Sequence, residues 1–184
     1  MALTRLRIVA GEGALGEQVL EIARHAIVNR PDEAACRFDI LDMRQRLWRE
    51  RPPRGDWDIK LADGGLVDLE FILQQEMLLS GNEASVIPTV RDAIDRLAET
   101  GALSEEDAGT LTSAFQFMQC LQQIQRLAVG AELTAENFSR GLKRRLAMAT
   151  SCENFSQLES RYVAVTKAVS SIRCKKIGPL ATES

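Results

Sequence analysis

The residues best suited to chemistry lie in one stretch, IKLADGGLVDLEF, at residues 59–71. Lys60 supplies an ammonium group, and Gly64 and Gly65 leave the backbone N–H groups at the start of a predicted helix uncovered. Free N–H groups, the positive end of a helix dipole and an ammonium together favour an anion such as a phosphate group. The same two glycines also suit a plain turn before a helix, so both interpretations are open.

Two carboxylates, Asp68 and Glu70, fall within the apolar run that follows. Because residues two positions apart lie on nearly opposite faces of a helix, the two cannot hold one metal ion between them. An unpaired carboxylate in a core costs roughly several kcal/mol, so each needs its own partner. We expect Asp68 to accept hydrogen bonds from the preceding loop or to pair with an arginine, and Glu70 to form a structural ion pair with Arg44 or Arg46. The alternative is that the whole motif, Lys60 included, only stabilises the helical packing.

Other groups that could perform catalysis are few. The only Asp-x-Asp, Asp56-Trp57-Asp58, follows RPPRG and is interpreted as part of the loop leading to Lys60 rather than as a metal site. The four cysteines are widely spaced without a CxxC pair, and His25 is the one histidine, which argues against a zinc site. We therefore predict no metal ligands and no catalytic residues in this sequence.

Composition narrows the class of protein. A chain of 184 residues that is 45% apolar can bury one core, and a net charge of −3 argues against a general nucleic-acid binder. Local basic clusters at 140–145 and 173–176 are interpreted as solvated helix faces. No signal-peptide pattern and no apolar run of membrane-spanning length is present, so we expect a cytoplasmic protein with reduced thiols and no membrane partner.

Apolar residues recurring with a period near 3.6 predict an all-α bundle of six or seven helices with a short extended N-terminal segment. The 64–79 helix carries apolar residues nearly all round, so it should be central. The first helix should turn one face inward. The predicted helices cover 14–28, 31–51, 64–79, 88–99, 104–129, a sixth from Thr134 and 154–173, and the inward face of the first comprises Leu15, Val19, Ile22, Ala23 and Ala26.

Three segments follow from this pattern. Residues 1–12 read as a short strand, the remnant of a preceding domain or a linker; residues 13–175 form the helical bundle; and residues 176–184 form a disordered tail. The apolar side chains of the first segment have few local partners and are predicted to dock a missing domain, namely Leu3, Leu6, Ile8 and Val9.

The stretch DIKLADGGLVDLEFILQ resembles the helical-domain motif of glutamine synthetase adenylyltransferases, which has a lysine, a short spacer, Gly-Gly, two residues, Asp-(Ile/Leu)-Glu-Phe and a glutamine. The matching residues are Lys60, Gly64, Gly65, Asp68, Leu69, Glu70, Phe71 and Gln74. The resemblance extends over most of the chain. FDILDMRQRLWRE is similar to an arginine-rich helix of the family, and LTRLRIVAG resembles the end of the preceding nucleotidyltransferase domain.

The resemblance implies a cytoplasmic enzyme of nitrogen control with two halves, each a nucleotidyltransferase domain followed by a helical bundle. One half transfers AMP from ATP to a tyrosine of glutamine synthetase, the other removes it by phosphorolysis, and glutamine and the PII signal protein bias the choice. The DIKLADGG form, with the chain ending soon after the bundle, resembles the adenylylating half. Family catalysis uses a Gly-Ser turn and three acids that hold Mg²⁺. This sequence has no Gly-Ser dipeptide, so ATP and Mg²⁺ belong to the full-length enzyme and the chain alone should be inactive.

Within that enzyme, the resemblance and the glycine pattern imply that Lys60, Gly64 and Gly65 face the nucleotide phosphates. The other motif residues then support the site, namely Asp68, Glu70, Phe71 and Gln74. The implied partners are the nucleotidyltransferase domain in cis, glutamine synthetase, PII and glutamine. Two alternatives stay open. One is the accessory bundle of a PII uridylyltransferase, and the other is a helical interaction module without nucleotide chemistry.

Overall fold

The computed structural model describes residues 2–28, 32–80, 86–128 and 134–180. Over these ranges the chain forms seven α-helices, two short 3₁₀ helices and no strand, which confirms the predicted all-α fold. None of the described helices has the length and hydropathy needed to span a bilayer. The elements are η1 (Ala2–Arg5), α1 (Gly13–Val28), α2 (Glu33–Glu50), α3 (Leu66–Ser80), α4 (Val90–Glu99), α5 (Glu105–Ala128), η2 (Ala135–Asn137), α6 (Arg140–Ala149) and α7 (Phe155–Lys176).

Most helix boundaries follow from N-cap side chains. Asp32, Thr89 and Asn154 each accept a hydrogen bond from the backbone N–H three residues further on, at the starts of α2, α4 and α7. Thr134 behaves differently. It precedes η2, and Ser139 caps α6 instead, so the predicted start of the sixth helix is wrong.

Two predicted helix limits cannot be compared with the structure. Pro31, the predicted first residue of the second helix, and Val129, the predicted last residue of the fifth, lie outside the described residues.

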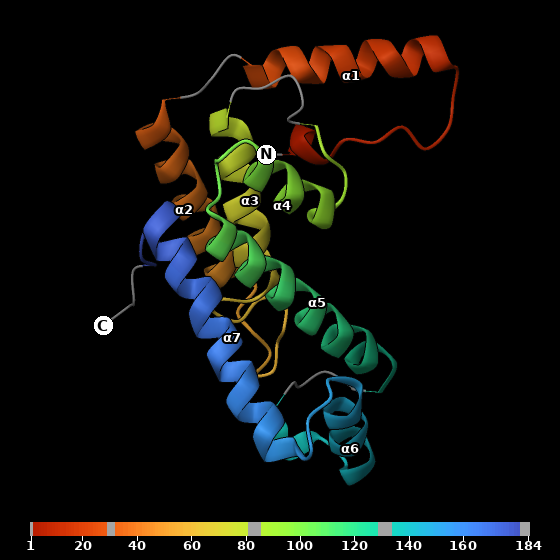
Figure 1. Cartoon of the computed structure of the whole chain (residues 1–184), viewed down its shortest axis with the longest axis vertical. Helices are drawn as coiled ribbons and strands as arrows, with labels where there is room; N and C mark the ends of the chain where they lie inside the picture. The colour runs from red at the N-terminus through yellow and green to blue at the C-terminus, as the bar shows by residue number, and fades with distance from the viewer. Residues whose placement is uncertain (1, 29–31, 81–85, 129–133, 181–184) are drawn as a thin grey trace.

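Helix α3 lies at the centre of the bundle, as predicted, and begins at Leu66 (Figure 1). It packs against α2, α4, α5, α7 and η1. Leu69 and Ile72 are completely buried, and buried residues occur on every side of the helix, which is what a helix surrounded by neighbours requires. The longer helices α5 and α7 extend away from this centre, and α6 packs against both of them (Figure 1).

Helix α1 forms over nearly the predicted range, but the predicted inward face is wrong. The helix projects along one end of the molecule and packs mainly against η1 (Figure 1). Leu15, Val19 and Ile22 are 60%, 38% and 70% exposed, and of the predicted face only Ala23 is buried, together with Ile27. The predicted residues do share one face of α1, but most of that face is exposed.

The predicted strand at the N-terminus is also wrong. Residues 2–5 form η1, because two contacts tie this turn to the helical core. The backbone N–H of Ile87 donates to the Thr4 carbonyl oxygen at 2.8 Å, and Arg5 forms an ion pair with Glu70. Residues 6–12 contain no regular element. The docking surface predicted there stays a prediction, and three of its four apolar side chains are exposed, namely Leu3, Ile8 and Val9.

At the other end, the ordered chain continues past the predicted boundary at residue 175. Lys176 is the last residue of α7 and lies 3.1 Å from Glu76, while Ile177 is buried in the core. Arg173 is buried as well, so the interpretation of the 173–176 cluster as a solvated face is wrong for Arg173, whereas Lys175 is exposed. Residues 181–184 lie outside the described residues.

The end of α7 is fastened to the start of α5 by an ion pair. Lys175 Nζ lies 3.0 Å from Asp107 Oδ2, and the Asp107 backbone N–H donates to Ser104 Oγ. Burial alone would raise the pKa of the Asp107 carboxyl, but the hydrogen bonds with Lys175 and Ser104 outweigh it and leave this pKa below its usual value.

A lowered pKa in the folded state stabilises the fold at neutral pH, and this contribution is lost as pH falls through that pKa. We expect Asp107→Asn to lower the free energy of unfolding by about 1 kcal/mol at pH 7, discounted because Lys175 is largely exposed. The difference from wild type should shrink below the ordinary carboxyl pKa of 3.8. Urea unfolding at pH 7, 4 and 3 measures it. Glu99→Gln, at an exposed pair with Arg96, is the control, and a difference independent of pH would contradict the assignment.

Candidate functional site

A buried ion pair lies in the first turn of α3, the helix that carries the motif. Asp68 is fully buried, and its Oδ1 accepts a hydrogen bond from Arg44 Nε of α2 at 2.6 Å. Its Oδ2 accepts the Gly64 backbone N–H at 2.6 Å and lies 3.7 Å from Arg173 Nη1 of α7. Asp68 thus makes both contacts that were expected of it, one with the preceding loop and one with an arginine.

The same arginines fasten the loop that precedes α3. Arg44 is 1% exposed, and its Nη2 donates to the carbonyl oxygens of Leu61 at 3.0 Å and Ala62 at 3.4 Å. Arg173 Nη1 lies 2.9 Å from Asp63 Oδ1. The loop is therefore held between α2 and α7, which fixes the place from which Lys60 projects.

Gly64 allows the close approach of this loop to α7, and Gly65 packs against carbonyl oxygens of the loop itself. Gly64 has φ +70°, and a Cβ placed on it would lie 1.9 Å from the Thr166 carbonyl oxygen. Its N–H is taken by Asp68, and the N–H groups of Gly65, Leu66 and Val67 donate to carbonyl oxygens of the loop itself. The N–H groups at the start of α3 thus have acceptors within the chain, which leaves Lys60 as the group of the motif that is open to an anion.

Glu70 points to the opposite side of α3, as expected, but its predicted partners are wrong. It pairs with Arg5 of η1 at 2.9 Å. Arg44 forms its ion pair with Asp68, and Arg46 pairs with Asp42 one turn away in α2. A contact between α3 and the N-terminal turn is not visible in local sequence spacing.

Phe71 and Gln74, the last residues of the motif, are half-buried. Phe71 packs against the hydrophobic core, and Gln74 lies beside Arg5 and Glu70 in a small surface hollow. Both positions belong to the packing of α3 against its neighbours.

Lys60 lies on the wall of a cleft of about 610 Å³, which we call the basic cleft. Its one acidic residue, Asp58, is buried and accepts backbone N–H groups of the loop, so its charge is directed inward. The cleft is lined by Arg51, Pro52, Arg54, Asp58, Ile59, Lys60, Leu61, Gln122, Gln125 and Arg126. Four cations against one internally bonded carboxylate make this surface suited to anions.

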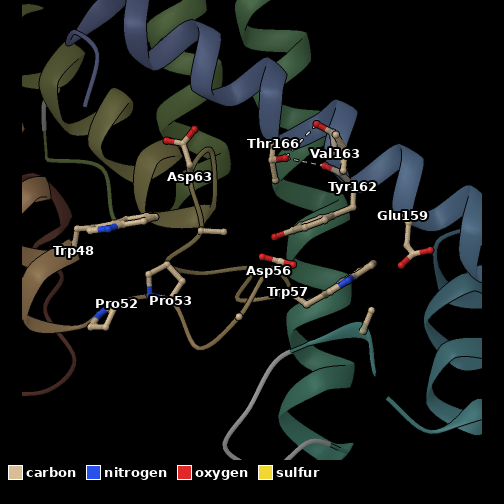
Figure 2. Close-up of a pocket in the computed structure, with 13 residues that line it drawn as sticks. Trp48, Pro52, Pro53, Asp56, Trp57, Asp63, Glu159, Tyr162, Val163 and Thr166 are labelled. Carbon is tan, nitrogen blue, oxygen red and sulfur yellow. Dashed lines mark hydrogen bonds between the residues drawn. The ribbon is translucent and has the colours of Figure 1, made fainter. Parts of the chain in front are cut away.

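A second cleft, of about 730 Å³, shares only Pro52 with the lining of the basic cleft, and we call it the aromatic cleft. Trp57 of the loop stacks on Tyr162 of α7 with ring centroids 4.7 Å apart, which forms one wall (Figure 2). The lining consists of Trp48, Pro52, Pro53, Gly55, Asp56, Trp57, Ala62, Asp63, Ala135, Glu159, Tyr162, Val163 and Thr166. Sequence reasoning missed this cleft because its walls come from segments far apart in the chain.

The structure is an all-α domain in which Gly64 and Gly65 precede a central helix and Asp68 pairs with Arg44 in the core. Residues 39–175 match the model of the family described as GlnD PII-uridylyltransferase. The chain belongs to this family. Among curated relatives, it is similar to proteins named bifunctional glutamine synthetase adenylyltransferase/adenylyl-removing enzyme. The resemblance predicted from the Gly-Gly motif is confirmed.

The similarity covers nearly all of this chain and a small part of each relative. Identity is 33% over 88% of the chain for the enzyme of Bradyrhizobium diazoefficiens, 30% over 97% for that of Rhodopseudomonas palustris and 35% over 87% for that of Xanthobacter autotrophicus. The chain spans only 16–18% of the length of these relatives.

The glycine geometry gives a test of the fold at the motif. We expect Gly64→Ala to lower the free energy of unfolding by about 3 kcal/mol. The added methyl group would strain a backbone in the left-handed region and would also clash with the backbone of α7. Gly109→Ala, with no heavy atom within 4 Å of the added Cβ, should raise the free energy of unfolding by about 0.5–1 kcal/mol, because alanine favours a helix more than glycine does. Guanidinium unfolding followed by circular dichroism measures both. A Gly64→Ala protein as stable as wild type would show that the loop does not approach α7 this closely.

Proposed function

We propose that this chain is the helical domain of a glutamine synthetase adenylyltransferase. It would act beside a nucleotidyltransferase domain that transfers AMP from ATP to a tyrosine of glutamine synthetase, in an enzyme biased by PII and glutamine. The observation that carries this proposal is 30–35% identity with such enzymes over 87–97% of the chain. ATP and Mg²⁺ would be held mainly by the nucleotidyltransferase domain, where the superfamily places its metal-binding acids.

The role of this chain in that enzyme would be to bind phosphate oxygens through the basic cleft. Within the described part of the chain, Arg51, Lys60 and Arg126 form no ion pair, and Arg54 lies 3.7 Å from Asp58. Cations without acidic partners attract polyphosphates, and guanidinium groups can bind phosphate oxygens in pairs. The cleft is thus suited to the triphosphate of ATP or to the leaving pyrophosphate.

Gly64 and Gly65 would support phosphate binding indirectly. Their N–H groups are bonded within the chain, so their contribution is the tight packing that holds the loop and aims Lys60. Asp68 acts with them by tying this loop to Arg44. The ammonium of Lys60, rather than the helix N-terminus, would then meet the phosphate.

A second candidate is the accessory bundle of a PII uridylyltransferase, which the description of the matching family favours. The basic cleft would suit UTP as well as ATP, because the phosphates are the same. Transfer assays with the full-length protein separate the two. Label moving from ATP to glutamine synthetase supports the first candidate, and label moving from UTP to PII supports the second.

We expect Lys60→Ala in the full-length enzyme to lower the transfer rate or the ATP affinity by about tenfold or more, equivalent to about 1.4 kcal/mol. The melting temperature should change little, since Lys60 is exposed. Steady-state kinetics with labelled ATP measure this effect. Lys167→Ala, at another exposed lysine outside both clefts, is the matched control. Unchanged kinetics for Lys60→Ala would assign the motif to packing alone.

The chain by itself should transfer no AMP, because the sequence lacks the Gly-Ser turn that accompanies the metal-binding acids. Purified chain, labelled ATP, Mg²⁺ and glutamine synthetase are incubated together, with the full-length enzyme as the positive control. EDTA-sensitive labelling of glutamine synthetase by the chain alone would overturn this prediction.

A further inference from the structure

The aromatic cleft carries negative charge that the proposed function does not use. Its lining includes three acidic residues and no basic one. Asp63 is compensated by Arg173 at 2.9 Å and by the hydroxyl of Ser170. Asp56 and Glu159 form no ion pair within the described residues, so two carboxylates remain free to meet a cation.

Tyr162 adds an unused hydroxyl to the same cleft. The residue is 5% exposed, and its hydroxyl oxygen is buried with no hydrogen-bond partner in the described part of the chain. Figure 2 shows this hydroxyl and the carboxylate of Asp56 directed into the same space. Burial, reinforced by the charges of Asp58 and Asp56, raises the pKa of Tyr162, so the group stays protonated and neutral. A buried hydroxyl without a hydrogen-bond partner is unfavourable, and a bound polar group would relieve this cost.

The remaining walls are flat and apolar. Trp48 is 41% exposed and lies with Pro52 and Pro53 on the other side of the cleft from Trp57 and Tyr162 (Figure 2). Aromatic faces attract cations, and ligand pockets of about 300–1,000 Å³ typically combine such apolar walls with a few polar groups. The cleft volume of about 730 Å³ falls in this range.

We propose that the aromatic cleft is a binding site for a cation carried on a planar or apolar body, such as a guanidinium or ammonium group. Asp56 and Glu159 meet the charge, the aromatic rings cover the body, and the Tyr162 hydroxyl bonds a polar atom of the ligand. The guanidinium or ammonium comes either from a small free amine or from an arginine or lysine side chain of a polypeptide. Lys60 is not part of the lining of this site, and the site does not depend on nucleotide chemistry.

The two tryptophans of the chain, Trp48 and Trp57, both line the cleft, so their two indole N–H resonances report binding directly. Three probes of similar shape are titrated into the purified chain at pH 7, namely benzamidine (cationic), benzamide (neutral) and benzoate (anionic). We expect benzamidine to shift both resonances with saturation, and the other two to bind at least tenfold more weakly. Equal binding of benzamide, or no saturable shift with benzamidine, overturns the proposal.

Variants distinguish recognition of the positive charge from nonspecific binding of the probe. Asp56→Asn and Glu159→Gln should each weaken benzamidine binding by about three- to tenfold, since each removes one free carboxylate. Lys60→Ala, in the basic cleft, should leave benzamidine binding unchanged. The dispersed indole resonances show that each variant is folded. Unchanged affinity in both carboxylate variants overturns the proposal, whatever the outcome of the transfer assays.

Two further probes identify the source of the cation. Agmatine and the capped peptide acetyl-Gly-Arg-Gly-amide carry the same guanidinium. Binding of the peptide at least tenfold more tightly than agmatine assigns the cleft to a polypeptide side chain, and the reverse order assigns it to a small amine. Similar affinities show that the guanidinium alone is recognised, and failure of both to bind contradicts the proposal.

Discussion

The arrangement of this domain depends on one buried ion pair, that of Arg44 with Asp68. Each charge costs several kcal/mol, roughly, to remove from water, and removing one partner would leave the other uncompensated. Arg44 Nε donates to Asp68 Oδ1 at 2.6 Å, and the pair makes further bonds with the Gly64 N–H and the Leu61 carbonyl oxygen, while Arg44 Nη1 is buried without a partner among the described residues. The loop before α3 therefore has one position in which these charges are matched. The pair determines where the loop lies more than it adds to stability.

That position separates two clefts of opposite charge. The loop directs Lys60 into the basic cleft and Asp56 into the aromatic cleft, and Pro52 lines both. Trp57 anchors the loop between them by stacking on Tyr162 and Phe155. A short segment thus contributes Arg54 and Lys60 to one cleft and Asp56 and Asp63 to the other. Any movement of the loop would change both clefts together, because the same backbone forms a wall of each.

Features set by local sequence could be predicted, and those set by distant contacts could not. The start of the last helix at Asn154 and the central place of α3 follow from residues within one helix. The glycine motif was recognised, but its physical reason lies in Thr166 of α7, far along the chain. Glu70 was matched to the wrong arginine for the same reason, since Arg5 reaches it only through the tertiary fold. The aromatic cleft has no local signature at all.

Two groups of basic residues in this chain differ in how many acidic partners they have. Near the end of α7, Arg173, Lys175 and Lys176 are each matched to an acid, namely Asp63, Asp107 and Glu76. The basic cleft gathers Arg51, Arg54, Lys60 and Arg126 around one carboxylate that is already bonded to the backbone. Like charges gathered in this way repel one another and favour unfolding. Such a cluster therefore does not contribute to holding the bundle together, and a bound anion is what would offset its repulsion.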